Sequence, residues 1–176
     1  MLARACLTFA KAGHRVSVLA RKKSRLERLT DQAQEFAGAI VGFPVDYCDS
    51  SALKATLAAS VEQFGPVHTI VAWIHSTAPE APQIAAEVLS ASHPVSFFHV
   101  LGSASADPSR EARLRPTFSS VPNILYHEVI LGFVVSSQER SRWLTNEEIS
   151  EGVLNAVAQR KETFVVGTVH PWSHRP

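Results

Sequence analysis

The start of the chain is the feature that most constrains its fold, because a helical segment there leads directly into a buried type of strand. Residues 1–13 (MLARACLTFAKAG) have the apolar spacing of a helix, and residues 14–22 (HRVSVLARK) read as a strand that ends in a basic turn. This order matches the second half of a βαβ nucleotide-binding unit, whose first strand and glycine-rich phosphate loop would come before Met1. The sequence therefore predicts a sheet that lacks its first strand.

The rest of the chain continues the alternation of strands and helices with short connections. That alternation is typical of an α/β protein with a mostly parallel sheet. The expected strands are residues 16–20, 40–45, 67–74, 95–101, 124–135 and 163–169, and the expected helices are 24–37, 50–65, 79–90 and 146–160. Asp49 or Ser50 is expected to cap the helix at 50–65, and Thr145 or Asn146 the last helix. Residues 102–123 are the least regular, with a short helix expected near 109–114.

These elements predict one domain, residues 1–176, with a Rossmann-like, doubly wound sheet between two layers of helices. In such a sheet the missing strand would lie between the strands at 16–20 and 67–74. Those two strands must either pair directly or leave a gap in which each lost backbone hydrogen bond costs roughly 1–3 kcal/mol. A domain with a net stability of about 5–15 kcal/mol could not absorb several such losses. We therefore expect the chain to be a fragment, or to start at an internal methionine.

Composition restricts the classes of partner. The formal net charge of the 176 residues is +1, so no global field favours nucleic acid or an anionic membrane. No apolar run reaches the ~18 residues of a membrane-spanning helix. Cys6 and Cys48 lie far apart, which fits a reducing, cytoplasmic location better than a disulfide scaffold. No histidine or cysteine spacing typical of zinc sites, Gly-x-Ser-x-Gly elbow or GxxxxGK[ST] loop is present, and no metal site is expected. The oligomeric state is left open, a homo-oligomer included.

The turn after the strand at 16–20 carries the first specific motif, Ala20-Arg21-Lys22-Lys23, with no carboxylate before Glu27. With this turn in place, the order of elements resembles the short-chain dehydrogenase/reductase family over nearly the whole chain. In that family an acidic residue in this turn binds the ribose 2′-hydroxyl of NAD, whereas Arg or Lys meets the 2′-phosphate of NADP. The resemblance implies that Arg21 and Lys22 bind NADP in preference to NAD. The alternative is a basic first turn on a solvated helix.

Two further positions match adenosine-binding stretches of that family. Asp46 and Tyr47, in VDYCD, resemble its Asp-Val-x-Asp motif, in which the aspartate meets the adenine amine and the next backbone N–H meets the ring. The alternative for Asp46 is a structural role in the strand-to-helix turn, although Asp49 fits the helix cap better. Ala72 and Trp73 replace the first residues of the family's Asn-Asn-Ala-Gly. The resemblance implies that Ala72 lets the backbone approach the cofactor and that Trp73 covers a ring; the alternative is that Trp73 belongs to the core.

The catalytic residues of the family are only partly matched. Ser103 follows the strand at 95–101, where the family has the serine of its Ser-Tyr-Lys mechanism, and Ser105 is the second candidate. His75 ends the strand at 67–74 and could act as an acid on a substrate; the alternative is a surface loop residue. No Tyr-x-x-x-Lys follows Ser103, because Tyr126 is the only later tyrosine and Ile130 stands four residues beyond it.

The resemblance thus implies an NADP(H)-binding protein that transfers hydride to or from a small carbonyl or alcohol substrate. Loss of the tyrosine–lysine pair leaves two alternatives open. One is a non-catalytic Rossmann module that binds a dinucleotide as a sensor or structural ligand, and the other is a truncated, inactive product.

Overall fold

The computed structural model describes residues 1–106, 118, 120–135 and 140–176. The helix expected at 109–114 lies outside these residues. The helices are α1 (Ala3–Lys11), α2 (Lys23–Asp31), α3 (Ser50–Phe64), α4 (Ala81–Leu89) and α6 (Asn146–Gln159), with two 3-10 turns, η1 (Ser103–Ala106) and η2 (Trp172–His174). The strands are β1 (Arg15–Ala20), β2 (Ala39–Pro44), β3 (Thr69–Trp73), β4 (Val95–Gly102), β5 (Ile124–Leu131), β6 (Phe133–Val135), β7 (Ser141–Trp143) and β8 (Thr163–Val166).

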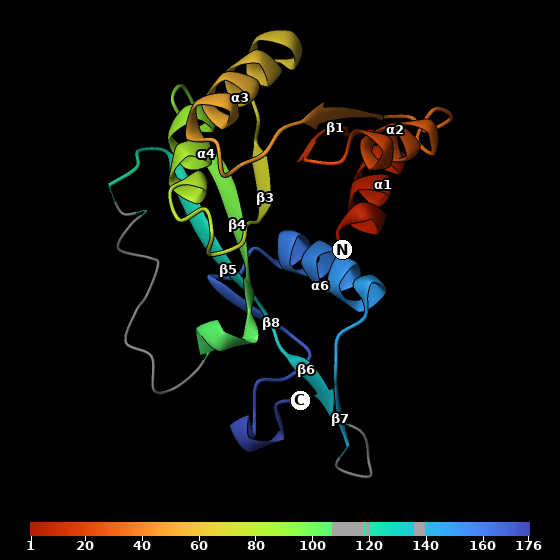
Figure 1. Ribbon diagram of the computed structural model, residues 1–176, viewed down its shortest axis with the longest axis vertical. Helices are drawn as coiled ribbons and strands as arrows, with labels where there is room; N and C mark the ends of the chain where they lie inside the picture. Colours follow the sequence, from red (N-terminus) through yellow and green to blue (C-terminus); the bar gives the residue numbers. More distant parts are fainter. Residues whose placement is uncertain (107–117, 119, 136–139) are drawn as a thin grey trace.

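Parallel strands form the centre of the molecule, in the order β3-β4-β5-β8. A second parallel pair joins β1 to β2, and β6 pairs antiparallel with β7. Figure 1 shows α3 and α4 on one side of the four-stranded sheet and α6, with α1 beside it, on the other. The predicted α/β, Rossmann-like class with helices on both faces is therefore confirmed.

The gap between β1 and β3 answers the question that the sequence left open. Within the described residues β1 hydrogen-bonds only to β2, and β3 only to β4, so the two strands do not pair directly. Side chains connect the two sheets instead, because Leu19 of β1 packs against the apolar cluster that contains Ala72 of β3. β1 and β3 thus share side-chain contacts but no backbone ladder.

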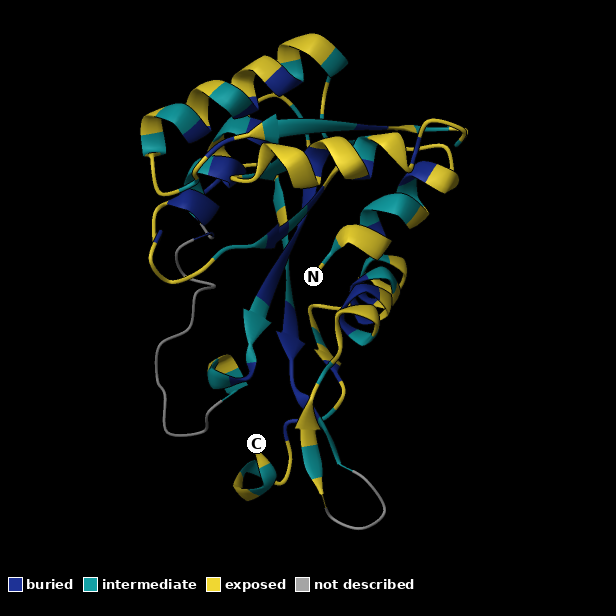
Figure 2. Cartoon of the chain, turned by 45° about the vertical axis from the view of Figure 1, so that its right-hand side comes forward, coloured by how far each residue is buried: buried dark blue, intermediate teal, exposed yellow. Residues whose placement is uncertain are grey.

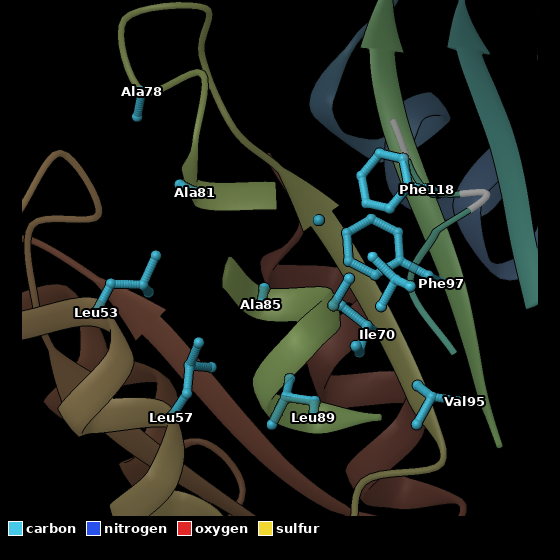
Figure 3. Close-up of a cluster of buried hydrophobic side chains, with 13 residues drawn as sticks. Leu53, Leu57, Ile70, Ala78, Ala81, Ala85, Leu89, Val95, Phe97 and Phe118 are labelled. Carbon is cyan, nitrogen blue, oxygen red and sulfur yellow. The ribbon is translucent and has the colours of Figure 1, made fainter. Parts of the chain in front are cut away.

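The core has two halves because side chains on a strand alternate between the faces of a sheet. Phe97 of β4 packs with Leu53, Ile70 and Leu89 on the side of α3 and α4 (Figure 3). Phe98, the next residue, packs on the opposite face in a cluster with Val153 of α6. Both phenylalanines are almost completely buried, and Figure 2 shows β4 as the most continuously buried strand. β4 is therefore the central strand on which both layers of helices are built.

The ends of the helices follow local sequence signals. The Asp49 carboxylate accepts a hydrogen bond from the Ala52 N–H (2.9 Å) and caps α3, and Gly65 ends that helix with φ of 83°. Thr145 caps α6 in a capping box with Glu148, whose carboxylate also receives two hydrogen bonds of 2.8 Å from Arg142. The predictions that Asp49 and Thr145 begin these helices are confirmed.

Three predicted boundaries are wrong. The strand expected at 124–135 is two strands, because the chain turns at Gly132, where a Cβ would lie 2.1 Å from the carbonyl oxygen of Thr168. Phe133 then pairs with Thr168, so the last strand ends at Val166 rather than 169. Helix α2 ends at Asp31, since tight turns after it bring the Gly38 N–H to the Ala10 carbonyl at 2.9 Å.

Among the described residues, none of the helices combines the length and the apolar character needed to cross a lipid bilayer.

Candidate cofactor and substrate site

The predicted site residues follow the carboxyl ends of successive parallel strands. Arg21 comes after β1, Asp46 after β2, His75 after β3 and Ser103 after β4. In open α/β sheets ligands bind at this end of the strands, because the loops there leave backbone and side-chain groups accessible. The positions of these four residues are therefore those expected for a ligand site. The contacts that each residue makes show which ligand groups it could bind.

Arg21 and Asp46 lie close to one another at the ends of the β1–β2 pair. Asp46 Oδ1 accepts a hydrogen bond from the Cys48 N–H (3.0 Å). This bond is the main reason that the pKa of the exposed Asp46 carboxyl is lowered, and the positive charge of Arg21 lowers it further. Asp49, and not Asp46, caps α3. Asp46 contributes to the turn only through its bond to the Cys48 N–H, and its carboxylate is exposed.

The amide of Tyr47 adds a donor beside that acceptor. Within the part of the chain that the structure describes, the Tyr47 N–H makes no hydrogen bond, while its side chain packs against the cluster around Phe97. An accessible carboxylate next to an unpaired N–H can bind a group that offers one donor and one acceptor on the same edge.

The basic turn after β1 contains two cations without a carboxylate partner. Lys23 forms an ion pair with Glu27 across one turn of α2, at 3.7 Å. Arg21 and Lys22 are exposed, and neither has an ion-pair partner among the described residues. Lys22 is the N-cap residue of α2 and makes no side-chain cap. These two side chains are therefore free to bind an anion.

The end of β3 places its predicted residues on different faces. Ala72 is buried on the α3–α4 side, whereas Trp73 packs partly buried against the α6 side. The Trp73 ring meets the exposed His75 ring edge-on at 5.7 Å. Trp73 thus packs against the core, as the alternative interpretation expected. Its ring also contacts the exposed His75 at the end of the strand.

Ser103 begins η1 and is only 5% exposed. Its Oγ accepts a hydrogen bond from Arg175 Nε at 2.9 Å, and no hydrogen bond joins it to His75 in the described structure. The Arg175 guanidinium lies 5.3 Å from the ring centroids of both Trp143 and Trp172. Ser103 therefore contacts the tail through Arg175, which in turn packs against Trp143 of β7 and Trp172.

Sequence reasoning missed two polar contacts of this sheet. Arg175 lies 72 positions from Ser103, in a short tail whose sequence, residues 170–176, carries no signal of this contact. His99 lies inside the apolar run VSFFHVL, is 3% exposed, and has its Nδ1 at 3.0 Å from the Tyr126 hydroxyl. Burial lowers the pKa of His99 to about 4. A histidine in a run of that kind is a recognisable sign of a buried, neutral ring.

Two surface depressions lie away from the candidate residues. One surface depression of about 300 Å³ lies between α6 and β8, and another of about 340 Å³ lies between α2 and β2. The described residues include no cluster of three or more His, Cys, Asp and Glu side chains that could hold a metal ion.

Comparison with known proteins shows what the chain is similar to. The family model described as short chain dehydrogenase matches residues 3–83, from α1 into α4. No curated protein matches the chain. Similar solved structures include an NADH-dependent reductase complexed with NAD, which has a TM-score of 0.70 and 12% identity, with 94% of this chain and 89% of that chain covered.

Two further structures have the same fold. An alcohol dehydrogenase from the archaeon Thermococcus sibiricus, complexed with 5-hydroxy-NADP, has a TM-score of 0.68 and 14% identity, with 98% and 92% of the two chains covered. A betaketoacyl-[ACP] reductase from Bacteroides thetaiotaomicron has a TM-score of 0.68 and 15% identity, with 93% and 90% covered. Identities this low show the fold. The family model covers residues 3–83, so this part of the chain is similar to the short chain dehydrogenases, and the solved structures show that the whole chain has their fold.

Proposed function

We propose that this chain is an NADP(H)-binding oxidoreductase that acts on a small carbonyl or alcohol substrate. Similarity to the short chain dehydrogenases supports a nicotinamide dinucleotide as cofactor, and two of the similar structures were solved with NAD or an NADP derivative. The observation that carries the choice of NADP is the pair of unpartnered cations, Arg21 and Lys22, directly after β1. A guanidinium fork suits a phosphate dianion and has no acidic residue in this turn to compete with it.

The neighbouring groups fit the adenine half of such a cofactor. The accessible Asp46 carboxylate can accept from the adenine amine, and the unpaired Tyr47 N–H can donate to the adjacent ring nitrogen. Arg21 lies close enough to affect the Asp46 carboxyl, so the phosphate and adenine contacts come from one compact region. Ala72 and Trp73 at the end of β3 complete the proposed cofactor-binding set.

At the other end of the site, Ser103 is proposed to hold the substrate carbonyl. The chemistry that NADPH would supply when bound is a hydride for the carbonyl carbon, and the carbonyl oxygen would then need a proton to give the alcohol. The Ser103 hydroxyl accepts one hydrogen bond from Arg175 Nε and still has its single proton to donate to that oxygen. His75 is the proposed proton donor, and its exposure allows water to return the proton.

One feature of the sequence favours a second candidate function. Tyr126 and Ile130 both belong to β5, so the only tyrosine after Ser103 lies in the sheet without a lysine four residues beyond it. A member of this family without the tyrosine–lysine pair can serve as a non-catalytic, dinucleotide-binding module.

A titration followed by NADPH fluorescence, paired with a screen of small ketones and aldehydes, separates these functions. The proposal expects NADPH binding and turnover that Ser103→Ala reduces strongly. The exposed Ser105 is the matched comparison, and loss of turnover in Ser105→Ala instead would transfer the role to that residue. Binding without turnover of any carbonyl favours the non-catalytic module, and absence of binding contradicts both functions.

A further inference from the structure

Arg175 is the charged side chain in contact with Ser103. Its Nε–H donates to Ser103 Oγ at 2.9 Å, and its Cζ lies 5.3 Å from the ring centroids of Trp143 and of Trp172. Figure 1 shows β7 and the tail at the same end of the molecule as η1, where β4 ends. One hydrogen bond and two cation–π contacts therefore hold the guanidinium against the serine hydroxyl.

Both partners keep donors that the described structure does not use. Among the described residues, the two terminal nitrogens of Arg175 make no hydrogen bond, and no carboxylate lies at ion-pair distance from them. The Ser103 hydroxyl accepts from Nε, and its own proton has no acceptor in the same part of the chain. By contrast, Arg142 donates from both terminal nitrogens to Glu148 at 2.8 Å.

The covalent geometry of the guanidinium directs two of these donors to one point. In this planar group the Nε–H bond is parallel to an N–H bond of one terminal nitrogen, and the two bonds lie on the same edge. Ser103 Oγ occupies the position in front of Nε. An acceptor in front of that terminal nitrogen can therefore stand beside Ser103 Oγ, at the roughly 2.7–2.8 Å of an O–H···O bond. Such an acceptor receives the serine proton and a guanidinium proton at once.

We propose that Arg175 is a catalytic residue, whose terminal N–H and the Ser103 O–H bind the same substrate carbonyl oxygen and stabilise the negative charge that it gains. The inference rests on the proposed function for the place of the substrate at Ser103, and it adds a second group in contact with the reacting oxygen. No Tyr-x-x-x-Lys follows Ser103 in the sequence to act on that oxygen.

The reaction step balances with these groups. When hydride reaches the carbonyl carbon, the electron pair of the C=O π bond moves to the oxygen, which becomes an alkoxide. The two donors stabilise this charge as it develops, and removal of one such donor typically lowers kcat about 10²–10³-fold. Arg175 keeps its protons, because a guanidinium is not deprotonated in proteins. The proton that completes the alcohol therefore comes from His75, the donor proposed above.

Binding of 4-nitrophenol tests the donor pair without turnover. Its phenolate carries one negative oxygen, as the alkoxide does, and absorbs at a longer wavelength than the phenol, so absorbance reports the ionisation of the bound ligand. We expect the full chain to bind the phenolate at least about tenfold more tightly than the phenol, which lowers the pKa of the bound ligand by about one. Arg175→Gln should abolish this preference and Ser103→Ala should weaken it, whereas Arg28→Gln, on the exposed face of α2, should keep it.

A second variant covers the case in which Arg175→Gln disturbs the tail. Arg175→Lys keeps the positive charge but has no planar fork that reaches Ser103 and a second oxygen together. Its preference for the phenolate should fall, while its thermal unfolding stays that of the unchanged chain. A preference that survives in Arg175→Gln would overturn the proposal, as would an unchanged chain that binds no 4-nitrophenol or does not prefer the phenolate.

Reduction of 4-nitrobenzaldehyde with NADPH separates this inference from the proposed function. We expect Arg175→Gln to lower kcat about 100-fold and to change KM little, because the charge that Arg175 stabilises develops only in the transition state. A phenolate preference without turnover of any carbonyl supports the oxyanion site and contradicts the oxidoreductase. Turnover that Arg175→Gln leaves unchanged supports the oxidoreductase and overturns the inference. Faster turnover in Arg175→Gln would show that the tail obstructs Ser103, which also overturns it.

Discussion

Acidification is predicted to destabilise the fold through His99. The ring is 3% exposed and lies among the rings of Phe97, Phe118 and Tyr126, and burial lowers its pKa from 6.5 to about 4. The unfolded chain therefore binds a proton below about pH 6.5 that the folded chain does not bind. Stability from the neutral ring is present above the unfolded pKa and is lost as the pH falls toward the folded value.

The size of this effect follows from the two pKa values. The interval from 6.5 to about 4, at about 1.36 kcal/mol per pH unit, corresponds to about 3 kcal/mol of unfolding free energy. That is a large share of the ~5–15 kcal/mol that stabilises a typical domain. The pKa values of the exposed Asp46 and Glu148 carboxyls are also lowered. Protonation of these two groups reduces stability only below the ordinary pKa of each carboxyl, which is a lower pH range than that of His99.

Urea unfolding followed by circular dichroism between pH 7 and pH 4.5 measures the effect. In His99→Gln the side chain no longer titrates but can still bind the Tyr126 hydroxyl, so the loss of stability over this range should become much smaller. His14→Gln, at an exposed turn, is the control and should keep the pH dependence of the unchanged chain. If His99→Gln and the unchanged chain lose stability in parallel, His99 is not the neutral, buried group described above.

Two further substitutions test local features of the fold by urea unfolding. Thr145→Ala removes the N-cap of α6 and should cost about 1 kcal/mol; an unchanged stability would mean that the capping box contributes nothing. Gly152→Ala should destabilise the chain by about 1 kcal/mol although alanine favours helices, because its Cβ would lie 2.3 Å from Val166 Cγ1 and overpacking costs about 1–3 kcal/mol. Adding Val166→Ala should recover part of that loss, and a stabilised Gly152→Ala would contradict the close packing of α6 on β8.

Features with local causes could be predicted from the sequence. Asp49 and Thr145 begin helices because a side-chain oxygen there binds an N–H of the first turn, which depends only on the next few residues. The apolar run at 95–101 indicated β4 because both faces of a central strand are buried. The order of these elements was sufficient to predict the α/β, Rossmann-like fold, which the similar solved structures share.

Features with distant causes could not be predicted. The break at Gly132 depends on the approach of the Thr168 carbonyl, and the Ser103–Arg175 bond joins segments 72 positions apart. The lack of pairing between β1 and β3 and the packing of Leu19 against the α3–α4 side of the core also involve segments far apart in the sequence. Likewise Asp46, Tyr47, Trp73 and His75 are placed at the strand ends as expected, but their roles toward a ligand stay predictions.

The choice of NADP rests on Arg21, and a pair of titrations tests it most directly. NADPH and NADH are titrated against the full chain and against Arg21→Glu, with fluorescence as the readout. We predict that the unchanged chain binds NADPH more tightly than NADH, and that Arg21→Glu weakens NADPH binding by tenfold or more, about 1.4 kcal/mol, while NADH binding changes little. Equal losses for both dinucleotides, or no binding of either by the unchanged chain, would contradict the account.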